Sequence, residues 1–219
     1  RNVDMWSWCG GVSSSTEEGI NTYLTAMTQL EADYPGVRFV YMTGHLDGSG
    51  TEGNLHQRNE QIRAYCRAHD KILFDFADIE SFDPDGLVNY RALYATDGCE
   101  YDTNGDGNPW GDGNWAAEWL ADNPGSELAG LAVGCGECAH SQTLNCVMKG
   151  RAFWWMMARI AGWCGPGLDG ALDEDGDVGS DDALILANYL AGCLDDLPCD
   201  ASRAACDHDG SVNVVDCVW

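Results

Sequence analysis

Strand and helix patterns alternate along the first third of the chain, and this alternation restricts the fold more than any other feature. Residues 3–9, 37–42 and 71–76 are short apolar runs of the kind that form buried strands. Helix-start signals and apolar residues at helical spacing occupy residues 13–30 and 55–69 between them. Strands that alternate with helices pair in parallel through crossover connections. We therefore predict an α/β fold with a parallel sheet and flanking helices.

The later part of the chain is less regular. Residues 86–136 are predicted to be rich in loops, with one short helix near residues 115–121. A further helix is expected over residues 147–163, and the Gly-Pro-Gly at residues 165–167 is typical of a linker. We therefore predict two domains: residues 1–164 form the α/β domain, and residues 165–219 form a small helical module.

Binding sites in parallel α/β sheets lie at the carboxyl ends of the strands. The loops at residues 8–15, 43–53 and 78–85 are therefore candidates, and His45 in the second could serve either a site or the loop itself. Acids near the end of the third strand could bind a cation or a sugar, or merely cap loops; they are Asp75, Asp78, Glu80, Asp83 and Asp85.

Aromatic residues divide into two groups by their neighbours in the sequence. Some stand near expected loops and are predicted to line a cleft: Trp6, Trp8, Trp110, Trp115 and Trp119. Others stand in the most apolar helix and are predicted to be core: Phe153, Trp154, Trp155 and Trp163.

The chain has 11 cysteines, more than a reducing cytosol usually tolerates without a metal or redox role. Cys135 and Cys138 form a Cys-x-x-Cys pair that could bind zinc or undergo redox chemistry, but no second pair stands at zinc-finger spacing. Disulfide bonds in an extracellular, secreted protein are the favoured interpretation. Because 11 is odd, one thiol is expected to lack a partner within the chain.

The charge balance excludes several classes of partner. There are 36 acidic residues against 11 Lys and Arg, which gives a net charge of −25. Nucleic acids need basic side chains to neutralise their phosphates, so they are not expected as partners, and neither is a membrane surface. No apolar run reaches the roughly 20 residues of a membrane-spanning helix. The chain begins almost inside a strand and stops just after an Asp-rich loop, so we expect a piece of a longer protein.

Two stretches near the C-terminus have the pattern of a calcium loop. Calcium prefers six or more oxygen ligands from a tightly curved loop, with acids at alternate positions, a Gly and a closing acid. The candidate ligands are Asp173, Asp175, Asp177 and Asp182 in the first copy, and Asp207, Asp209, Ser211 and Asp216 in the second. An acidic turn without a metal is the alternative.

These two loops, with a helix expected over residues 183–190, resemble the duplicated calcium-binding unit of dockerins and related EF-hand repeats. The resemblance covers about residues 168–219 and implies Ca²⁺ as a cofactor and a cohesin-like protein as a partner. Ala171 and Ala205 replace the Asp that normally opens each loop, which should weaken calcium binding. The second helix of the unit is almost absent.

A third, isolated Asp-x-Asn-x-Asp-Gly pattern is formed by Asp102, Asn104 and Asp106. Its twelfth position is Gly113 rather than an acid. A structural calcium site and a simple Asn/Gly turn cluster are both open interpretations.

Several motifs in the first domain resemble secreted SGNH/GDSL-type hydrolases. They are MWSWCG at residues 5–10, FVYMTGHLDG at 39–48, FDFADIE at 74–80, CAHS at 138–141 and KGRAFWW at 149–155. The resemblance covers about residues 1–163. It implies a flavodoxin-like α/β sandwich that hydrolyses esters with a serine nucleophile, a histidine base and an oxyanion hole.

The resemblance carries over to four residues of this chain. His140 would be the base and Glu137 its carboxylate partner, in place of the usual Asp. Gly10 or Gly11 would supply an oxyanion-hole amide, and His45 stands where an Asn donor is usual. The serine block is not found in this chain. A structural, hydrogen-bonded role for His140 remains an alternative.

Together these features predict an extracellular SGNH-like hydrolase, an esterase acting on polysaccharide or a similar polymer, with a calcium-binding tail. The alternative is a non-catalytic binding or assembly protein on a degenerate SGNH scaffold, which the Glu at residue 137 and the absent serine favour.

Overall fold

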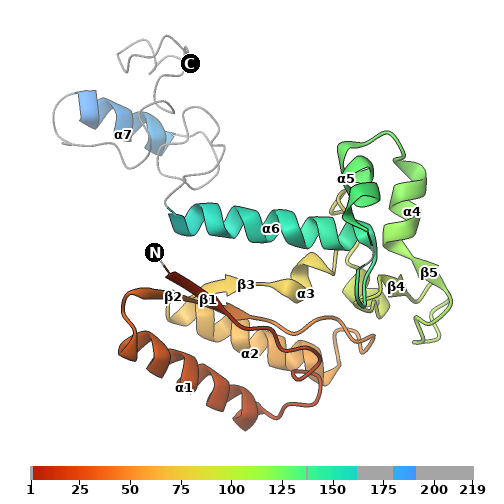
Figure 1. The fold of residues 1–219 in the computed structure, drawn as a ribbon, viewed down its shortest axis with the longest axis horizontal. Coiled ribbons are helices and arrows are strands. Elements are labelled where there is room, and N and C mark those ends of the chain that lie inside the picture. Colours follow the sequence, from red (N-terminus) through yellow and green to blue (C-terminus); the bar gives the residue numbers. More distant parts are fainter. Residues whose placement is uncertain (1, 137, 162–179, 191–219) are drawn as a thin grey trace. The chain divides into compact units, whose positions relative to one another are not determined.

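The computed structural model describes residues 2–136, 138–161 and 180–190. The chain divides into two compact units, Arg1–Met156 and Met157–Trp219. The first unit contains a parallel sheet and the helices that pack on it (Figure 1).

A three-stranded parallel sheet forms the centre of the first unit. Its strands are β1 (Asn2–Met5), β2 (Val37–Met42) and β3 (Ile72–Phe74), in the order β1-β2-β3. Both neighbouring pairs are parallel, so the predicted mixed α/β fold with a parallel sheet and flanking helices is confirmed. β1 ends earlier than predicted because the chain turns at Cys9 and Gly10, whose φ angles are 40° and 80°.

Two long helices cover one face of the sheet (Figure 1). They are α1 (Glu17–Asp33) and α2 (Asn54–Ala68), close to the predicted ranges. Thr16 caps α1 by accepting the Gly19 N–H on its hydroxyl at 3.0 Å. The apolar face of both helices and the middle strand form one core, which contains Val12, Ile20, Tyr23, Leu24, Met27, Phe39, Tyr41, Leu55, Ile62 and Cys66.

α3 (Phe76–Ile79) follows directly on the end of β3, and the first part of α6 (Thr143–Ala161) passes over the face of the sheet opposite to α1 and α2 (Figure 1). The rings of Phe74 on β3 and Phe153 on α6 meet edge to face, with centroids 6.2 Å apart. α6 begins at Thr143 rather than at the predicted residue 147.

The middle of the chain is more regular than the sequence predicted. It contains a 3₁₀ helix at Tyr90–Leu93, β4 (Glu100–Tyr101), β5 (Gly113–Asn114), α4 (Trp115–Asp122) and α5 (Glu127–Cys135). The prediction of a single helix here was wrong, because α5 consists mainly of small residues and shows little apolar periodicity. Its start is marked by the Ser126 hydroxyl, which accepts the Ala129 N–H at 3.1 Å.

A second core joins this region to the loop after β2, to α3 and to α6. It contains Leu46, Ala77, Tyr90, Ala95, Cys99, Trp115, Ala116, Trp119 and Leu144. Trp115 and Trp119 were predicted to line a cleft, but they are buried in this core. Phe153, Trp154 and Trp155 were predicted to be core, but 39%, 74% and 45% of their surfaces are exposed. Trp163 lies outside the described residues.

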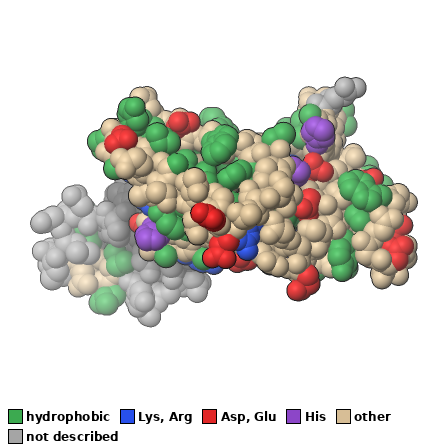
Figure 2. Space-filling view, turned by 90° about the horizontal axis from the view of Figure 1, so that it is seen from below, with side chains coloured by type: hydrophobic (Ala, Val, Ile, Leu, Met, Phe, Trp, Pro, Cys, Tyr) green, Lys and Arg blue, Asp and Glu red, His purple; other side chains and the backbone are tan. Residues whose placement is uncertain are grey.

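In the second unit the structure describes α7 (Ser180–Leu190), which includes the predicted helix over residues 183–190. Among the helices described, none is long and apolar enough to cross a membrane. Acidic side chains are spread over the face shown in Figure 2, in keeping with the net charge of −25.

Candidate functional site

A cavity of about 440 Å³ lies where loops at the carboxyl ends of β1 and β2 meet α3 and α6. Each of the three loops chosen from the sequence contributes to it. The lining residues are Ser7, Cys9, His45, Phe76, Glu80, Asp97, Ala139, His140 and Lys149.

The peptide groups on both sides of His45 are fixed by buried side chains. The Gly44 N–H donates to Asn59 Oδ1 at 2.8 Å, and the Gly44 carbonyl accepts from Asn59 Nδ2 at 3.1 Å. The Leu46 N–H donates to Glu80 Oε2 at 2.6 Å. With three backbone groups held in this way, the His45 backbone has a single well-defined position at the cavity wall.

The imidazole of His45 is oriented by two oxygen atoms. Its Nδ1 is 3.0 Å from the Leu46 carbonyl oxygen and 3.5 Å from Asp97 Oδ2. Since a carbonyl and a carboxylate only accept, Nδ1 carries the proton and Nε2 of the neutral ring keeps its lone pair. In this tautomer Nε2 accepts a proton; donation to an oxyanion would require the protonated ring.

Gly10 lies directly beside this nitrogen. A Cβ atom built on Gly10 would be 3.5 Å from His45 Nε2. The turn is tied to the end of β2, because Trp8 Nε1 donates to the Met42 carbonyl at 2.9 Å. The structure therefore brings together Gly10 and His45, two of the residues named from the sequence.

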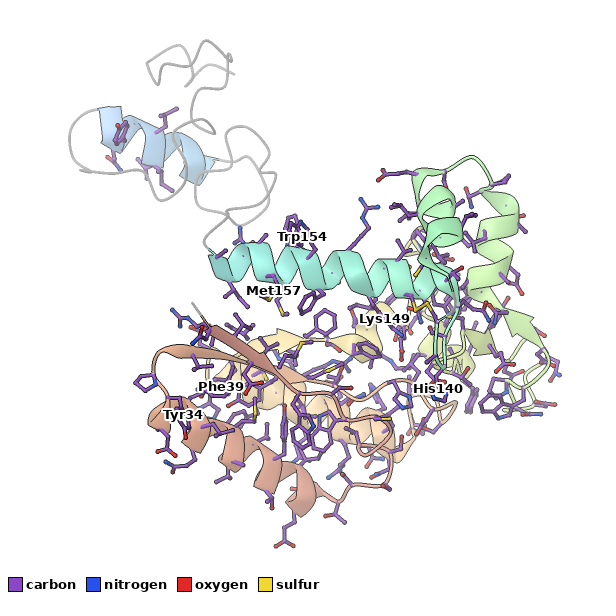
Figure 3. All side chains as sticks on the ribbon, viewed as in Figure 1. Tyr34, Phe39, His140, Lys149, Trp154 and Met157 are labelled. Carbon is purple, nitrogen blue, oxygen red and sulfur yellow. A yellow bond between two sulfur atoms is a disulfide. The ribbon has the colours of Figure 1, made fainter. Side chains whose placement is uncertain are left out.

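Glu80 and Lys149 form a buried ion pair at the base of the cavity. Lys149 Nζ is 2.6 Å from Glu80 Oε1 and 4.2 Å from the centre of the Phe76 ring. Glu80 is completely buried. Burial raises the pKa of Glu80, and the Lys149 ammonium and the Leu46 amide act in the opposite direction. The pair joins α3 to α6, as the position of Lys149 in Figure 3 illustrates.

His140 lines the same cavity from the loop that precedes α6 (Figure 3). This loop is closed by a disulfide between Cys138 and Cys146, which accords with the predicted use of disulfides. The buried Cys99 thiol lies beside this loop, near the Gln142 backbone and the Ser141 side chain. His140 has a φ of 56°, and its side chain is exposed. Glu137, its expected partner, lies outside the described residues.

Among the acids near the end of β3, Asp75, Glu80 and Asp83 bind protein groups. Asp75 accepts from Arg63 Nε at 2.6 Å and from Arg63 Nη2 at 2.7 Å, and it caps α3 through the Asp78 N–H. Asp83 accepts from Tyr90 Oη at 2.9 Å. These contacts correspond to the loop-capping alternative of the sequence analysis.

The loop after β4 wraps around Asp102. The two carboxylate oxygens of Asp102 accept the N–H groups of Asn104, Gly105 and Gly107 at 3.0, 2.7 and 2.7 Å. These hydrogen bonds lower the pKa of Asp102. Asn104 and Asp106 likewise accept the N–H groups two residues further along the chain. As described, this loop is held by its own turns.

In the part of the chain that the structure describes, no three His, Cys, Asp or Glu side chains are grouped so that they could hold a metal ion. The candidate calcium ligands Asp173, Asp175, Asp177, Asp207, Asp209, Ser211 and Asp216 lie outside the described residues. Asp182 falls within α7, but its side chain is not described.

The sequence reasoning missed Asp97, Lys149 and the function of Glu80. Asp97 stands in an irregular segment that no motif marked, and Lys149 contacts Glu80 across 69 positions of sequence. Glu80 and Lys149 do stand in the quoted motifs FDFADIE and KGRAFWW, but neither motif indicates that the two side chains meet or that Glu80 is buried.

Comparisons of the chain with protein-family models, with curated proteins and with solved structures found no match. The fold and the cavity therefore define the class of protein by themselves. It is a mixed α/β protein whose three-stranded parallel sheet carries a histidine-lined cavity beside its strand ends.

Proposed function

We propose that the chain is an extracellular hydrolase that cleaves esters on a polysaccharide or a similar polymer, as its SGNH-like motifs suggest. One observation carries most of this proposal: His45 and His140 line one cavity together with an acid, Asp97, that orients the first ring. Ester hydrolysis needs a group that accepts a proton from the nucleophile and returns it to the leaving group. An imidazole with a free Nε2 can do both.

The cavity is also suited to a neutral acyl group. Phe76 and Ala139 contribute apolar surface, and the nearby charges of Glu80 and Lys149 compensate each other. A fixed histidine in such a setting needs little reorganisation when charge develops during the reaction. In the SGNH-like arrangement His140 would serve as the base, with Glu137 as its carboxylate partner.

The direct test is hydrolysis of p-nitrophenyl acetate by the wild-type chain and by His140→Ala. We expect the substitution to lower kcat/KM by about 100-fold or more, the usual contribution of a general acid–base group. His69→Gln is the matched control, because His69 is an exposed histidine that follows α2. A His140→Ala variant that keeps wild-type kcat/KM would remove His140 from the mechanism.

A non-catalytic binding or assembly protein is the alternative. It gains support from the serine block that was not found and from the Glu at residue 137. On this alternative the wild-type chain binds a polysaccharide or a protein partner and releases no p-nitrophenol above the rate of buffer.

We further propose that the C-terminal Asp-rich loops bind Ca²⁺ and that this tail docks to a cohesin-like protein. The proposal rests on the two repeated patterns at Asp173–Asp182 and Asp207–Asp216. Carboxylate oxygens at alternate positions of a curved loop are the ligands that calcium prefers. Without an Asp at either first position, the affinity is expected to be weak, about 10⁻⁴–10⁻³ M as in extracellular modules.

A further inference from the structure

Cys9 is an exposed thiol in the wall of the same cavity. It follows β1 and has a φ of 40°, in the left-handed region that non-glycine residues rarely adopt, and Gly10 continues the turn with a φ of 80°. The Trp8–Met42 hydrogen bond fixes this turn against the end of β2. A strained turn after a strand is a common way to present a nucleophilic side chain.

Gly10, the chain neighbour of Cys9, lies beside the ring of His45. Gly10 is placed so that a Cβ atom would come within 3.5 Å of His45 Nε2. On the opposite side of the ring, Nδ1 is 3.0 Å from the Leu46 carbonyl and 3.5 Å from Asp97. Cys9, His45 and Asp97 therefore line one cavity, with Asp97 on the Nδ1 side of the ring and the Cys9–Gly10 turn on the Nε2 side; a thiol, an imidazole and an orienting carboxylate are the groups that thiol catalysis uses.

The other described free thiols are arranged differently. Cys66 and Cys99 are buried, and burial raises the pKa of each to about 12, so both are expected to be unreactive. Cys135 is exposed, but its sulfur is 3.7 Å from that of Cys138, which is already bonded to Cys146. Among the described thiols, Cys9 alone combines exposure with the histidine-lined cavity.

We propose that Cys9 is a nucleophile of this site, with His45, rather than the His140 of the SGNH-like arrangement, as its base and Asp97 as the positioning residue. The inference rests on the proposed ester hydrolysis and supplies a nucleophile from within the chain. The substrate class is an ester with an acyl group small enough for the cavity of about 440 Å³.

The reaction balances without any further reagent. His45 Nε2 takes the proton of the Cys9 thiol while the sulfur bonds to the carbonyl carbon. The C–O bond then breaks, and the leaving alkoxide takes the proton from His45, which leaves a thioester. Water then attacks the thioester carbon and gives one proton to His45 Nε2. The C–S bond breaks and releases the carboxylic acid. The Cys9 thiolate takes the proton back from His45.

The first experiment measures alkylation of the native full chain by iodoacetamide, followed at each cysteine by peptide mass spectrometry. At about pH 6.5 an ordinary thiol is only about 1% thiolate. We expect Cys9 to react about tenfold faster than Cys135 in the same molecules. His45→Gln and Asp97→Asn should each slow Cys9 by about tenfold, and His69→Gln should not. A Cys9 that reacts no faster than Cys135, or that is found in a disulfide, overturns the inference.

The second experiment separates this inference from the proposed function. If the chain hydrolyses p-nitrophenyl acetate, Cys9→Ala should abolish turnover and the acetylated Cys9 peptide should disappear. Turnover that persists in Cys9→Ala contradicts the nucleophile and leaves the hydrolase standing. A wild-type chain without turnover contradicts the hydrolase, while fast, His45-dependent alkylation would still support the activated thiol.

Discussion

Single hydrogen-bonding side chains determine where His45 lies. Asn59 pairs with both the backbone N–H and the backbone carbonyl of Gly44, and Glu80 pairs with the Leu46 N–H. All these groups are buried, and a buried polar group that loses its partner costs about 1–3 kcal/mol. Gly44 is itself required, because a Cβ atom there would lie 2.7 Å from Val12 Cβ.

Replacement of Asn59 by Ala should therefore destabilise the protein by about 2–3 kcal/mol, because it leaves the N–H and carbonyl of Gly44 unpaired. Urea denaturation of the two forms measures this difference. Asn54→Ala is the control on the same helix: Asn54 is exposed and donates to the Ser13 and Ser15 carbonyls. We expect it to change stability by less than about 1 kcal/mol. Equal effects of the two substitutions would contradict this account of the loop.

At the level of secondary structure, a buried ion pair joins the end of α3 to α6. Glu80 follows α3 and is completely buried, and its partner Lys149 reaches it from α6 at 2.6 Å. Removing one partner of a buried pair leaves an uncompensated charge, which is more costly than replacing both.

Lys149→Met should cost about 3 kcal/mol of stability at pH 7. Burial already raises the pKa of Glu80, and Lys149→Met removes the ammonium group that most strongly lowers this pKa. The folded variant then holds a proton on Glu80 more tightly than the unfolded chain does. The contribution of Glu80 to the stability of this variant is therefore greatest below the ordinary Glu pKa of about 4.3 and is lost as the pH rises through the raised value.

Urea denaturation of Lys149→Met and wild type at pH 4.5 and pH 7 tests whether the stability deficit of the variant grows with pH, as predicted. Arg151→Met is the control from an exposed position of the same helix, and Glu80→Gln combined with Lys149→Met should recover part of the loss. A Lys149→Met variant whose deficit is larger at pH 4.5 than at pH 7 would refute the buried-charge explanation.

The stability that Asp102 gives to the loop after β4 should depend on pH in the direction opposite to that of Glu80 in Lys149→Met: it is lost at low pH. Backbone amides lower the pKa of Asp102, so its contribution to stability is present above the ordinary Asp pKa of about 3.9 and is lost as the pH falls through the lowered value. Asp102→Asn should lower Tm at pH 7, and its difference from wild type should shrink toward pH 2. Asp106→Asn, an exposed change in the same loop, should have a smaller effect. A difference that is constant with pH would contradict the role of the charge.

Secondary structure with clear periodicity could be predicted from the sequence, and the contacts between distant elements could not. β2 was predicted at its observed bounds, and α1 and α2 within a few residues, because apolar spacing and helix caps are local signals. α5 was missed, because small residues carry no such signal. The burial of Trp115 and the exposure of Trp154 depend on tertiary packing that sequence position does not reveal.

The candidate site could be predicted only in part, because some of its residues meet only through tertiary packing. The rule that sites lie at strand ends directed attention to loops that line the cavity, and His45 and His140 both line it. Asp97 and Lys149 come from segments far from His45 in sequence. Their relation to the cavity follows from the packing of the second core, which no local pattern encodes.

For the whole molecule, the excess of carboxylates predicts a response to cations. A net charge of −25 opposes the compact state through self-repulsion, which salt screens. Calcium bound at the Asp-rich loops would add a specific stabilisation that depends on its concentration. We expect about 10 mM CaCl₂ to raise Tm by more than NaCl of equal ionic strength. Asp175→Asn combined with Asp209→Asn is the matched variant, and equal shifts with both salts would contradict a calcium site.

The central claim is that the cavity with the two histidines is a site of ester hydrolysis. Turnover of p-nitrophenyl acetate by the full chain and by the double variant His45→Gln, His140→Ala tests it most directly. We predict that the wild-type chain turns over the ester and that the double variant loses at least about 100-fold in kcat/KM while staying folded. A double variant that matches the wild-type rate, or a wild-type chain no faster than buffer, would contradict the claim.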